Sequence, residues 1–185
     1  MERIMLATAE DVELVARLYD EVNEYFELTE NYCYPNWQKG KYPVFRDAQE
    51  AFEEKTLYVL KEDDAVLGSI IINQKQHPEY RRMPWKMQAS DDEVMTIHTL
   101  VVDPKIRNRG LGEKLVRFSI EFCKNAGAKT IRNDTHFRNV PARNLYVKCG
   151  FQSLGCQTAC ADGIMQEFDV LEYFFQEGRE GVCQC

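Results

Sequence analysis

Residues 94–112 read VMTIHTLVVDPKIRNRGLG, a stretch that passes from an apolar strand through a Gly- and Arg-rich turn into a helix. The strand is expected over residues 94–102, and the helix from about Gly110 to Asn125. Glycine lets backbone N–H groups approach an anion closely, and the N-terminus of a helix adds partial positive charge. The turn therefore predicts a binding site for a phosphorylated cofactor.

Hydrophobic periodicity and turn residues predict the elements on either side of this stretch. Residues 1–4 are expected to lead directly into helical sequence, with Thr8 as the N-cap of the first helix. The other expected elements are a short helix at 47–54, strands at 57–60, 66–72 and 128–135, a short helix that begins at Pro141, and a hairpin that pairs 151–160 with 165–175. Antiparallel hairpins around one β-α-β unit predict an α/β (α+β) fold with a mixed sheet and helices on its faces.

The length of 185 residues suits a single domain, expected over 1–175 and followed by a polar C-terminal tail over 176–185. Hydrophobic residues make up 44% of the chain, which suffices for a core, but the apolar runs are too short to span a bilayer. The N-terminus lacks the long apolar segment of a signal peptide, which favours a cytoplasmic protein without a membrane partner. The seven cysteines indicate reduced thiols, and because their spacing is not that of a zinc site, no metal is expected.

The net charge of −7 argues against nucleic-acid binding, but the charge is unevenly distributed. Residues 101–148 hold eleven Lys or Arg and four Asp or Glu, a local net charge of +7, whereas the remainder carries −14. This division fits an anionic cofactor on one half of the molecule and a cationic substrate on the other. A charge distribution that serves only solubility is the alternative.

The turn does not fit two common phosphate-binding motifs. A dinucleotide fingerprint needs a small residue three places after its second glycine, where this chain has Leu115, and a P-loop needs Gly-Lys-Ser/Thr, which is absent. Arg107-x-x-Gly110-x-Gly112 instead resembles the Arg/Gln-x-x-Gly-x-Gly/Ala pattern of the GCN5-related N-acetyltransferases, the GNAT family.

A second motif supports this resemblance. Residues 139–151 read NVPARNLYVKCGF, which is similar to the family's Asn-x-x-Ala-x-x-Leu-Tyr-x-x-x-Gly-Phe signature, with Cys149 where members commonly have Leu. Together with the strand before the turn, the motifs cover about 94–155. The resemblance implies a mixed, splayed β-sheet of about six to seven strands flanked by helices on both faces. It also implies acetyl-CoA as the donor and a primary amine of a small molecule or peptide as the acceptor, which attacks directly in a ternary complex.

The resemblance further implies where acetyl-CoA binds. The strand splays from its neighbour at Leu100, Val101 and Val102, and the backbone there pairs with the pantetheine arm. Asn139 contacts the cofactor, and Tyr146 lies beside the thioester sulfur. The residues whose amides hold the pyrophosphate are Arg107, Asn108, Arg109, Gly110, Leu111 and Gly112.

Acetyl transfer requires a neutral amine and a proton for the leaving thiolate. Tyr146, with a reference pKa of about 10, can donate that proton; a core tyrosine is the alternative. His98 is the predicted base, since its unperturbed pKa of about 6.5 suits deprotonation of an ammonium. Strand alternation is expected to place His98 on the same face as Leu100 and Val102. Glu93, one residue before the strand, is the rival base, and a purely structural role is the alternative for His98.

Two aromatic loops predict the acceptor pocket. Aromatic side chains can bind the apolar part of an amine, or its ammonium through a cation–π contact, or they can simply anchor long loops to the core. Asp134 and His136, at the end of the strand after the central helix, are also expected at the cleft. The predicted substrate-binding residues are Tyr34, Trp37, Tyr80, Trp85 and His136.

Two rival functions stay open at this point. One is transfer of another acyl group from its CoA thioester, and the other is a CoA-binding sensor or structural protein without turnover. The presence of Tyr146 favours the enzyme. The aromatic run at 173–175 indicates either a buried strand or a contact in a possible homodimer.

Overall fold

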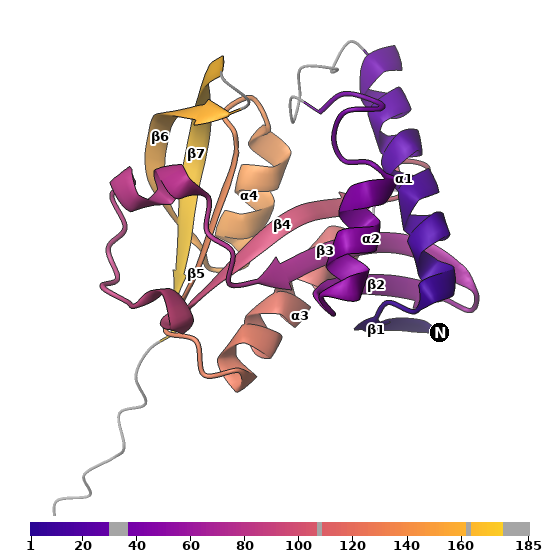
Figure 1. Ribbon diagram of the computed structural model, residues 1–185, viewed down its shortest axis with the longest axis horizontal. Coiled ribbons are helices and arrows are strands. Elements are labelled where there is room, and N and C mark those ends of the chain that lie inside the picture. Colours follow the sequence, from indigo (N-terminus) through magenta and orange to yellow (C-terminus); the bar gives the residue numbers. More distant parts are fainter. Residues whose placement is uncertain (30–36, 107–108, 162–163, 176–185) are drawn as a thin grey trace, which may run out of the picture.

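The computed structural model describes residues 1–29, 37–106, 109–161 and 164–175 (Figure 1). Its elements in chain order are β1 (Glu2–Leu6), α1 (Ala9–Leu28), α2 (Phe45–Glu53), β2 (Leu57–Glu62), β3 (Ala65–Asn73), η1 (Pro78–Arg82), η2 (Asp91–Glu93), β4 (Val94–Val102), α3 (Leu111–Asn125), β5 (Thr130–His136), α4 (Val140–Lys148), β6 (Gln152–Ala161) and β7 (Ile164–Phe174). None of the described helices has the length and apolarity needed to cross a bilayer.

The seven strands form one mixed sheet in the order β1-β2-β3-β4-β5-β7-β6. The β4–β5 pair is parallel, and the other pairs among the described strands are antiparallel. Helices α1 and α2 cover one face, and α3 and α4 cover the other (Figure 1). The arrangement confirms the predicted mixed sheet with helices on both faces.

The N-terminal segment was predicted wrongly. Instead of leading directly into a helix, residues 2–6 form β1, which pairs with β2 along its whole length. Its hydrogen bonds reach across more than fifty residues of sequence, so its five residues carry no local signal that separates a strand from a helix start. Thr8 does occupy the N-cap of α1, in a capping box in which the Asp11 carboxylate accepts from the Thr8 backbone N–H at 2.9 Å. The other predicted elements are present, with small shifts at their ends.

The sheet separates two hydrophobic cores. The core beneath α3 and α4 includes Leu115, Ile131 and Tyr146, and the core beneath α1 and α2 includes Val15 and Tyr19. Burial of these apolar side chains is the main favourable contribution to folding. Because side chains alternate along a strand, membership of one core or the other tells which face of the sheet a strand residue occupies.

Strands β4 and β5 pair over only three residues. Val94, Met95 and Thr96 pair with Thr130, Ile131 and Arg132, and beyond them the two strands separate (Figure 1). The main-chain groups of 97–102 that face β5 therefore have no strand partner in the described part of the chain. This separation confirms the splay that the family resemblance implies, and it opens the sheet between its two halves.

A β-bulge in β4 reverses the alternation of its side chains. Ser69 and Ile71 of β3 pair with Val101 and His98, so one strand advances by two residues while the other advances by three. Thr99, inside the bulge, has φ +47°, an uncommon conformation for a β-branched residue. The expectation that His98 shares a face with Leu100 was therefore wrong.

Core membership confirms the reversal. Ile97, before the bulge, and Leu100, after it, both pack against the core beneath α3 and α4, whereas Val101 belongs to the core beneath α1 and α2. His98, next to Ile97, thus lies on the face opposite to Leu100. Tyr42 holds the bulge from outside the sheet, because its hydroxyl lies 2.5 Å from Oγ1 of Thr99.

A buried ion pair fastens the segment 74–93 to the sheet. Glu172 on β7 is fully buried, and its carboxylate accepts hydrogen bonds from Arg132 Nε at 3.3 Å and from the Lys86 backbone N–H at 2.8 Å. The Arg132 guanidinium also donates to Gln76 Oε1 at 3.0 Å and to the Met87 carbonyl at 2.8 Å. The pair thus fixes the segment on both sides of η1.

Replacing Glu172 with alanine is expected to lower the free energy of unfolding by about 3–5 kcal/mol, because it leaves the Arg132 guanidinium buried without its counter-ion. Glu50→Ala, which breaks the exposed i,i+4 pair with Arg46, is the matched control and should cost less than about 1 kcal/mol. Urea unfolding of both variants measures the difference. Equal losses in the two variants would contradict this role of Glu172.

Candidate functional site

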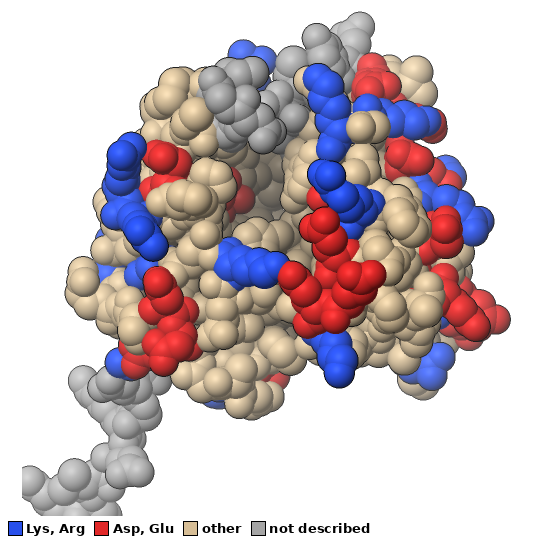
Figure 2. Space-filling view, viewed as in Figure 1, with Lys and Arg blue, Asp and Glu red and all other residues tan. Residues whose placement is uncertain are grey.

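A cavity of about 420 Å³ lies where β4 and β5 separate. Its walls come from 97–100 of β4, from 134–136 of β5, from η1 and its flanks, from α4, and from β6 and β7. In the space-filling view the molecule is hollowed between its two halves, and the hollow is walled mainly by residues that are neither acidic nor basic (Figure 2). The opening of the sheet thus becomes a site accessible from outside.

Tyr146 places a phenol in this cavity. It lies on α4, is 5% exposed, and packs its ring edge-on against Phe151 at 5.2 Å between centroids. Burial raises the pKa of Tyr146 above its ordinary value. The hydroxyl therefore keeps its proton at neutral pH and can act as a donor.

His98 lines the cavity from β4, at the bulge. Its Nε2 lies 3.1 Å from both the Lys75 carbonyl and Asn73 Oδ1, and 2.8 Å from Thr96 Oγ1. The carbonyl and amide oxygens only accept, which assigns the proton to Nε2 and leaves Nδ1 as the basic nitrogen. Burial lowers the pKa of His98, so the imidazole is neutral at pH 7.

The structure does not bring Glu93 into the cavity. Its carboxylate pairs with Lys129 Nζ at 2.7 Å and accepts from the Ser90 backbone N–H at 3.0 Å, at the start of β4. These hydrogen bonds, that from Lys129 foremost, lower the pKa of Glu93 to about 2. The side chain is thus a paired carboxylate at the surface, at the closed end of the β4–β5 opening.

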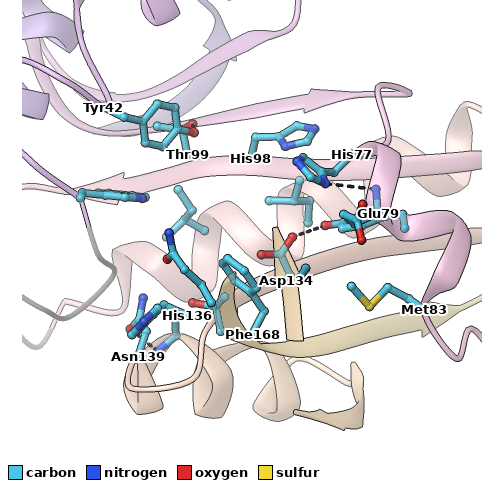
Figure 3. Close-up of a pocket in the computed structure, with 18 of the residues that line it drawn as sticks. Tyr42, His77, Glu79, Met83, His98, Thr99, Asp134, His136, Asn139 and Phe168 are labelled. Atoms are coloured by element: carbon cyan, nitrogen blue, oxygen red, sulfur yellow. Dashed lines mark hydrogen bonds between the residues drawn. The ribbon is translucent and has the colours of Figure 1, made fainter. Parts of the chain in front are cut away.

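Asp134 and Tyr80 form a polar pair inside the cavity (Figure 3). The Tyr80 hydroxyl donates to Asp134 Oδ1 at 2.5 Å. Burial raises the pKa of Asp134, although the hydrogen bond from Tyr80 acts against that shift. Trp85, predicted to bind substrate, lies outside the cavity wall and supports Tyr80 instead: its indole N–H donates to the Tyr80 carbonyl at 2.7 Å, and the two rings lie 5.0 Å apart.

Of the other residues that were predicted to bind the acceptor amine, two line the cavity and one is not described by the structure. Trp37 and His136 line the cavity, Trp37 against the Tyr42 ring at 5.8 Å between centroids. Tyr34 lies outside the described residues. Tyr42, His77 and Phe168 also line the cavity but were not predicted as site residues. Of these three, only Tyr42 had a signal in the sequence, because it lies in the same Tyr- and Trp-rich loop as Tyr34 and Trp37.

The predicted phosphate turn leads into an open helix end. Gly110, the N-cap of α3, has φ +68°, and a Cβ added there would meet no atom within 4 Å. The first intrahelical bond runs from Lys114 N to the Gly110 carbonyl, so the N–H groups of 111–113 have no partner within the helix. The turn therefore presents backbone donors and the positive end of the helix dipole to an anion.

Other residues of this turn have packing or charge partners. Leu111 is buried in the core, and a Cβ on Gly112 would come within 3.1 Å of the Leu145 side chain on α4, so Gly112 lets the two helices pack closely. The Arg109 guanidinium pairs with Glu2 and Glu62 at 2.6 and 2.9 Å. Arg107 and Asn108 lie outside the described residues.

Asn139 lies between β5 and α4, at the N-cap of α4. Its side chain caps the helix by accepting from the Ala142 backbone N–H at 3.2 Å, and it also lines the cavity. The predicted pantetheine strand lies opposite, where Leu100 lines the cavity and Val102 packs nearby against the core beneath α3. Val101 points to the other face of the sheet, so only its backbone can serve a ligand on the α3 side.

The profile of the Acetyltransferase (GNAT) family matches residues 2–151. The chain belongs to the GNAT acetyltransferase family. It is 31% identical over 90 residues to streptothricin acetyltransferase of Escherichia coli, an alignment that covers 49% of this GNAT chain and 48% of that protein. It is 32% identical over 68 residues to an N-acetyltransferase of unassigned role from Methanocaldococcus jannaschii, covering 37% and 30% of the two chains. This GNAT chain thus spans about half or less of the curated relatives that it matches.

Solved structures share the fold along the whole chain. A GNAT acetyltransferase from Streptococcus agalactiae superposes with a TM-score of 0.78 at 21% identity, covering 95% of this chain and 96% of that one. A Salmonella typhimurium protein assigned as an acetyltransferase, solved with its cofactor acetyl-CoA, has a TM-score of 0.68 at 15% identity, covering 98% and 99%. At these identities the likeness shows that this GNAT protein shares their fold.

Proposed function

We propose that the protein transfers an acetyl group from acetyl-CoA to a primary amine of a small molecule or peptide, by direct attack within a ternary complex. The observation that carries the proposal is the Tyr146 hydroxyl, which is buried in the cavity at the opening between β4 and β5. Membership of the GNAT family supports the acyl chemistry, and the relative solved with acetyl-CoA supports the donor.

The residues present fit acetyl-CoA. The open N-terminus of α3 suits the diphosphate, because Gly110 leaves space and the N–H groups of 111–113 are available. The unpaired edge of β4 at 97–102 suits the amide-bearing pantetheine arm, since an extended chain can add to a free strand edge. When bound there, the cosubstrate supplies the activated acetyl group.

The chain's own residues would then move two protons. The amine nitrogen bonds to the acetyl carbon as the carbon–sulfur bond breaks. His98 Nδ1 accepts the proton that leaves the amine, and the Tyr146 hydroxyl gives a proton to the departing thiolate. Glu93 has no part in this proposal, because Lys129 and Ser90 hold its carboxylate away from the cavity.

We also propose the cytoplasm as the compartment. Cys123, Cys149, Cys156 and Cys160 are all free thiols in the structure, which agrees with a reducing environment. Burial raises the pKa of Cys123 to about 12, so this thiol has no nucleophilic role at neutral pH.

The variant Tyr146→Phe is expected to lower kcat by about 10²–10⁴-fold, because it removes the proton donor while keeping the ring. Release of free thiol from acetyl-CoA with a panel of primary amines measures the rate, and calorimetry checks that acetyl-CoA still binds. Tyr173→Phe is the matched control, since its ring also packs on Phe151, at 5.3 Å, but lies outside the cavity wall.

Full turnover by Tyr146→Phe would contradict the assignment of the acid. CoA binding by the unaltered protein without turnover on any amine would instead indicate a CoA-binding sensor.

His98 is expected to set the acid limb of the kcat profile. Burial lowers its pKa, so the neutral, proton-accepting form persists to pH values below the ordinary 6.5, and kcat falls only as the pH drops through the lowered value. His98→Gln can keep the donor to the Lys75 carbonyl but cannot take up a proton, so this limb should disappear and kcat should drop. His136→Gln, a change at another histidine in the cavity wall, should keep the limb. An acid limb that persists in His98→Gln would assign the base elsewhere.

A further inference from the structure

The charged side chains that line the cavity are all acidic. Among the described wall residues, Asp134 and Glu79 carry carboxylates and none is a lysine or arginine. Besides Tyr146, four Trp, Tyr or Phe rings line the same cavity, and aromatic faces attract cations. These rings belong to Trp37, Tyr42, Tyr80 and Phe168. The composition of the wall therefore favours a ligand that is both apolar and positively charged.

Asp134 is the carboxylate without a counter-ion. Its side-chain hydrogen bond comes from the neutral Tyr80 hydroxyl, and the nearby His77 acts to lower its pKa. Among the described residues, no lysine or arginine forms an ion pair with it. Glu79, by contrast, pairs with Arg82 at 3.5 Å. Placing a carboxylate in a partly buried site costs free energy unless a cation or further donors compensate it. A bound ammonium would supply that compensation.

Asp134 lies on the face of β5 that is opposite to α3 and α4. Ile131 packs in the core beneath α3 and α4, so alternation puts Arg132 and Asp134 on the opposite face of β5. Arg132 contacts the segment 74–93 there, and Figure 3 shows Asp134 projecting between His77 and Phe168. Tyr146 belongs to the core on the other face. The carboxylate thus lies across the opening from the Tyr146 phenol, on the face of the sheet that also holds His98.

We infer that the acceptor is a diamine-type molecule, in which one amine reacts while a second, protonated amine binds the carboxylate of Asp134 against the aromatic wall. The inference rests on the proposed function and specifies its substrate class. A carboxylate beside the reacting nitrogen would stabilise the ammonium form, which is not nucleophilic. Asp134 therefore suits the ammonium that does not react, and the distance between the two groups selects the chain length of the acceptor.

The first test needs no variant. Thiol release is measured with acetyl-CoA and α,ω-diamines of three to six carbons, each compared with the 1-aminoalkane of the same length. For at least one length, kcat/KM should favour the diamine by about 10–100-fold, the value of one charge-assisted hydrogen bond. Turnover of diamines and monoamines at equal efficiency would overturn the inference and leave the proposed function intact.

Two variants then test which carboxylate causes the preference for the diamine. Asp134→Asn keeps the size of the side chain and an acceptor for Tyr80, but removes the charge, so the preference for the diamine should fall to within about threefold, mainly through KM. Glu79→Gln neutralises the other carboxylate of the wall, which already pairs with Arg82, and should retain most of the preference. Retention by Asp134→Asn would assign the cation to another group and overturn the inference.

Calorimetry tests binding of the second amine independently of acetyl transfer. Binding of the preferred diamine to the protein in the presence of CoA should weaken at least about tenfold in Asp134→Asn. This result is expected even if no amine is acetylated, in which case the proposed function fails while the cation site stands. Equal diamine affinity in the unaltered protein and Asp134→Asn would overturn the site itself.

Discussion

The short pairing of β4 with β5 is the constraint on which the site depends. After three paired residues the strands separate, and the backbone of 97–102 faces an opening instead of a neighbour. Continued pairing would satisfy these groups internally and close the cavity. The bulge at Thr99 also shapes the cavity, because it turns Leu100 towards α3 while His98 stays on the opposite face. The bulge thus places one residue of β4 on each face of the sheet beside the opening.

The two sides have different tasks in this account. Towards α3 and α4, the open helix end at Gly110 and the Tyr146 phenol face the donor. Towards the segment 74–93, Asp134 and the aromatic wall face the acceptor. The buried Arg132–Glu172 pair keeps that segment in place, and Tyr80 extends from it to Asp134. The charge division along the sequence, basic at 101–148 and acidic elsewhere, agrees with an anionic donor and a cationic acceptor.

The sequence predicted those parts whose signal is local. The strand at 94–102 and the helix from about 110 to 125 have clear periods, and the Gly-rich turn between them identified the family. The bulge could not be predicted, because a threonine at positive φ has no sequence signature and depends on its contact with Tyr42. The place of Glu93 at the surface depends on Lys129, which is distant in sequence and which no spacing rule connects to it. Trp85 likewise stacks under the guanidinium of the distant Arg132, at 4.9 Å, besides its contacts with Tyr80.

We propose that backbone donors at the start of α3 hold the diphosphate of acetyl-CoA. Calorimetric titration of CoA into Gly110→Asp and Gly110→Asn tests this binding mode. Both side chains tolerate the left-handed conformation at φ +68° and enter the same open space, so the variants differ in charge alone. Gly110→Asp is expected to bind CoA at least about tenfold more weakly than Gly110→Asn, because the added carboxylate and the diphosphate repel each other. Equal affinities would contradict it.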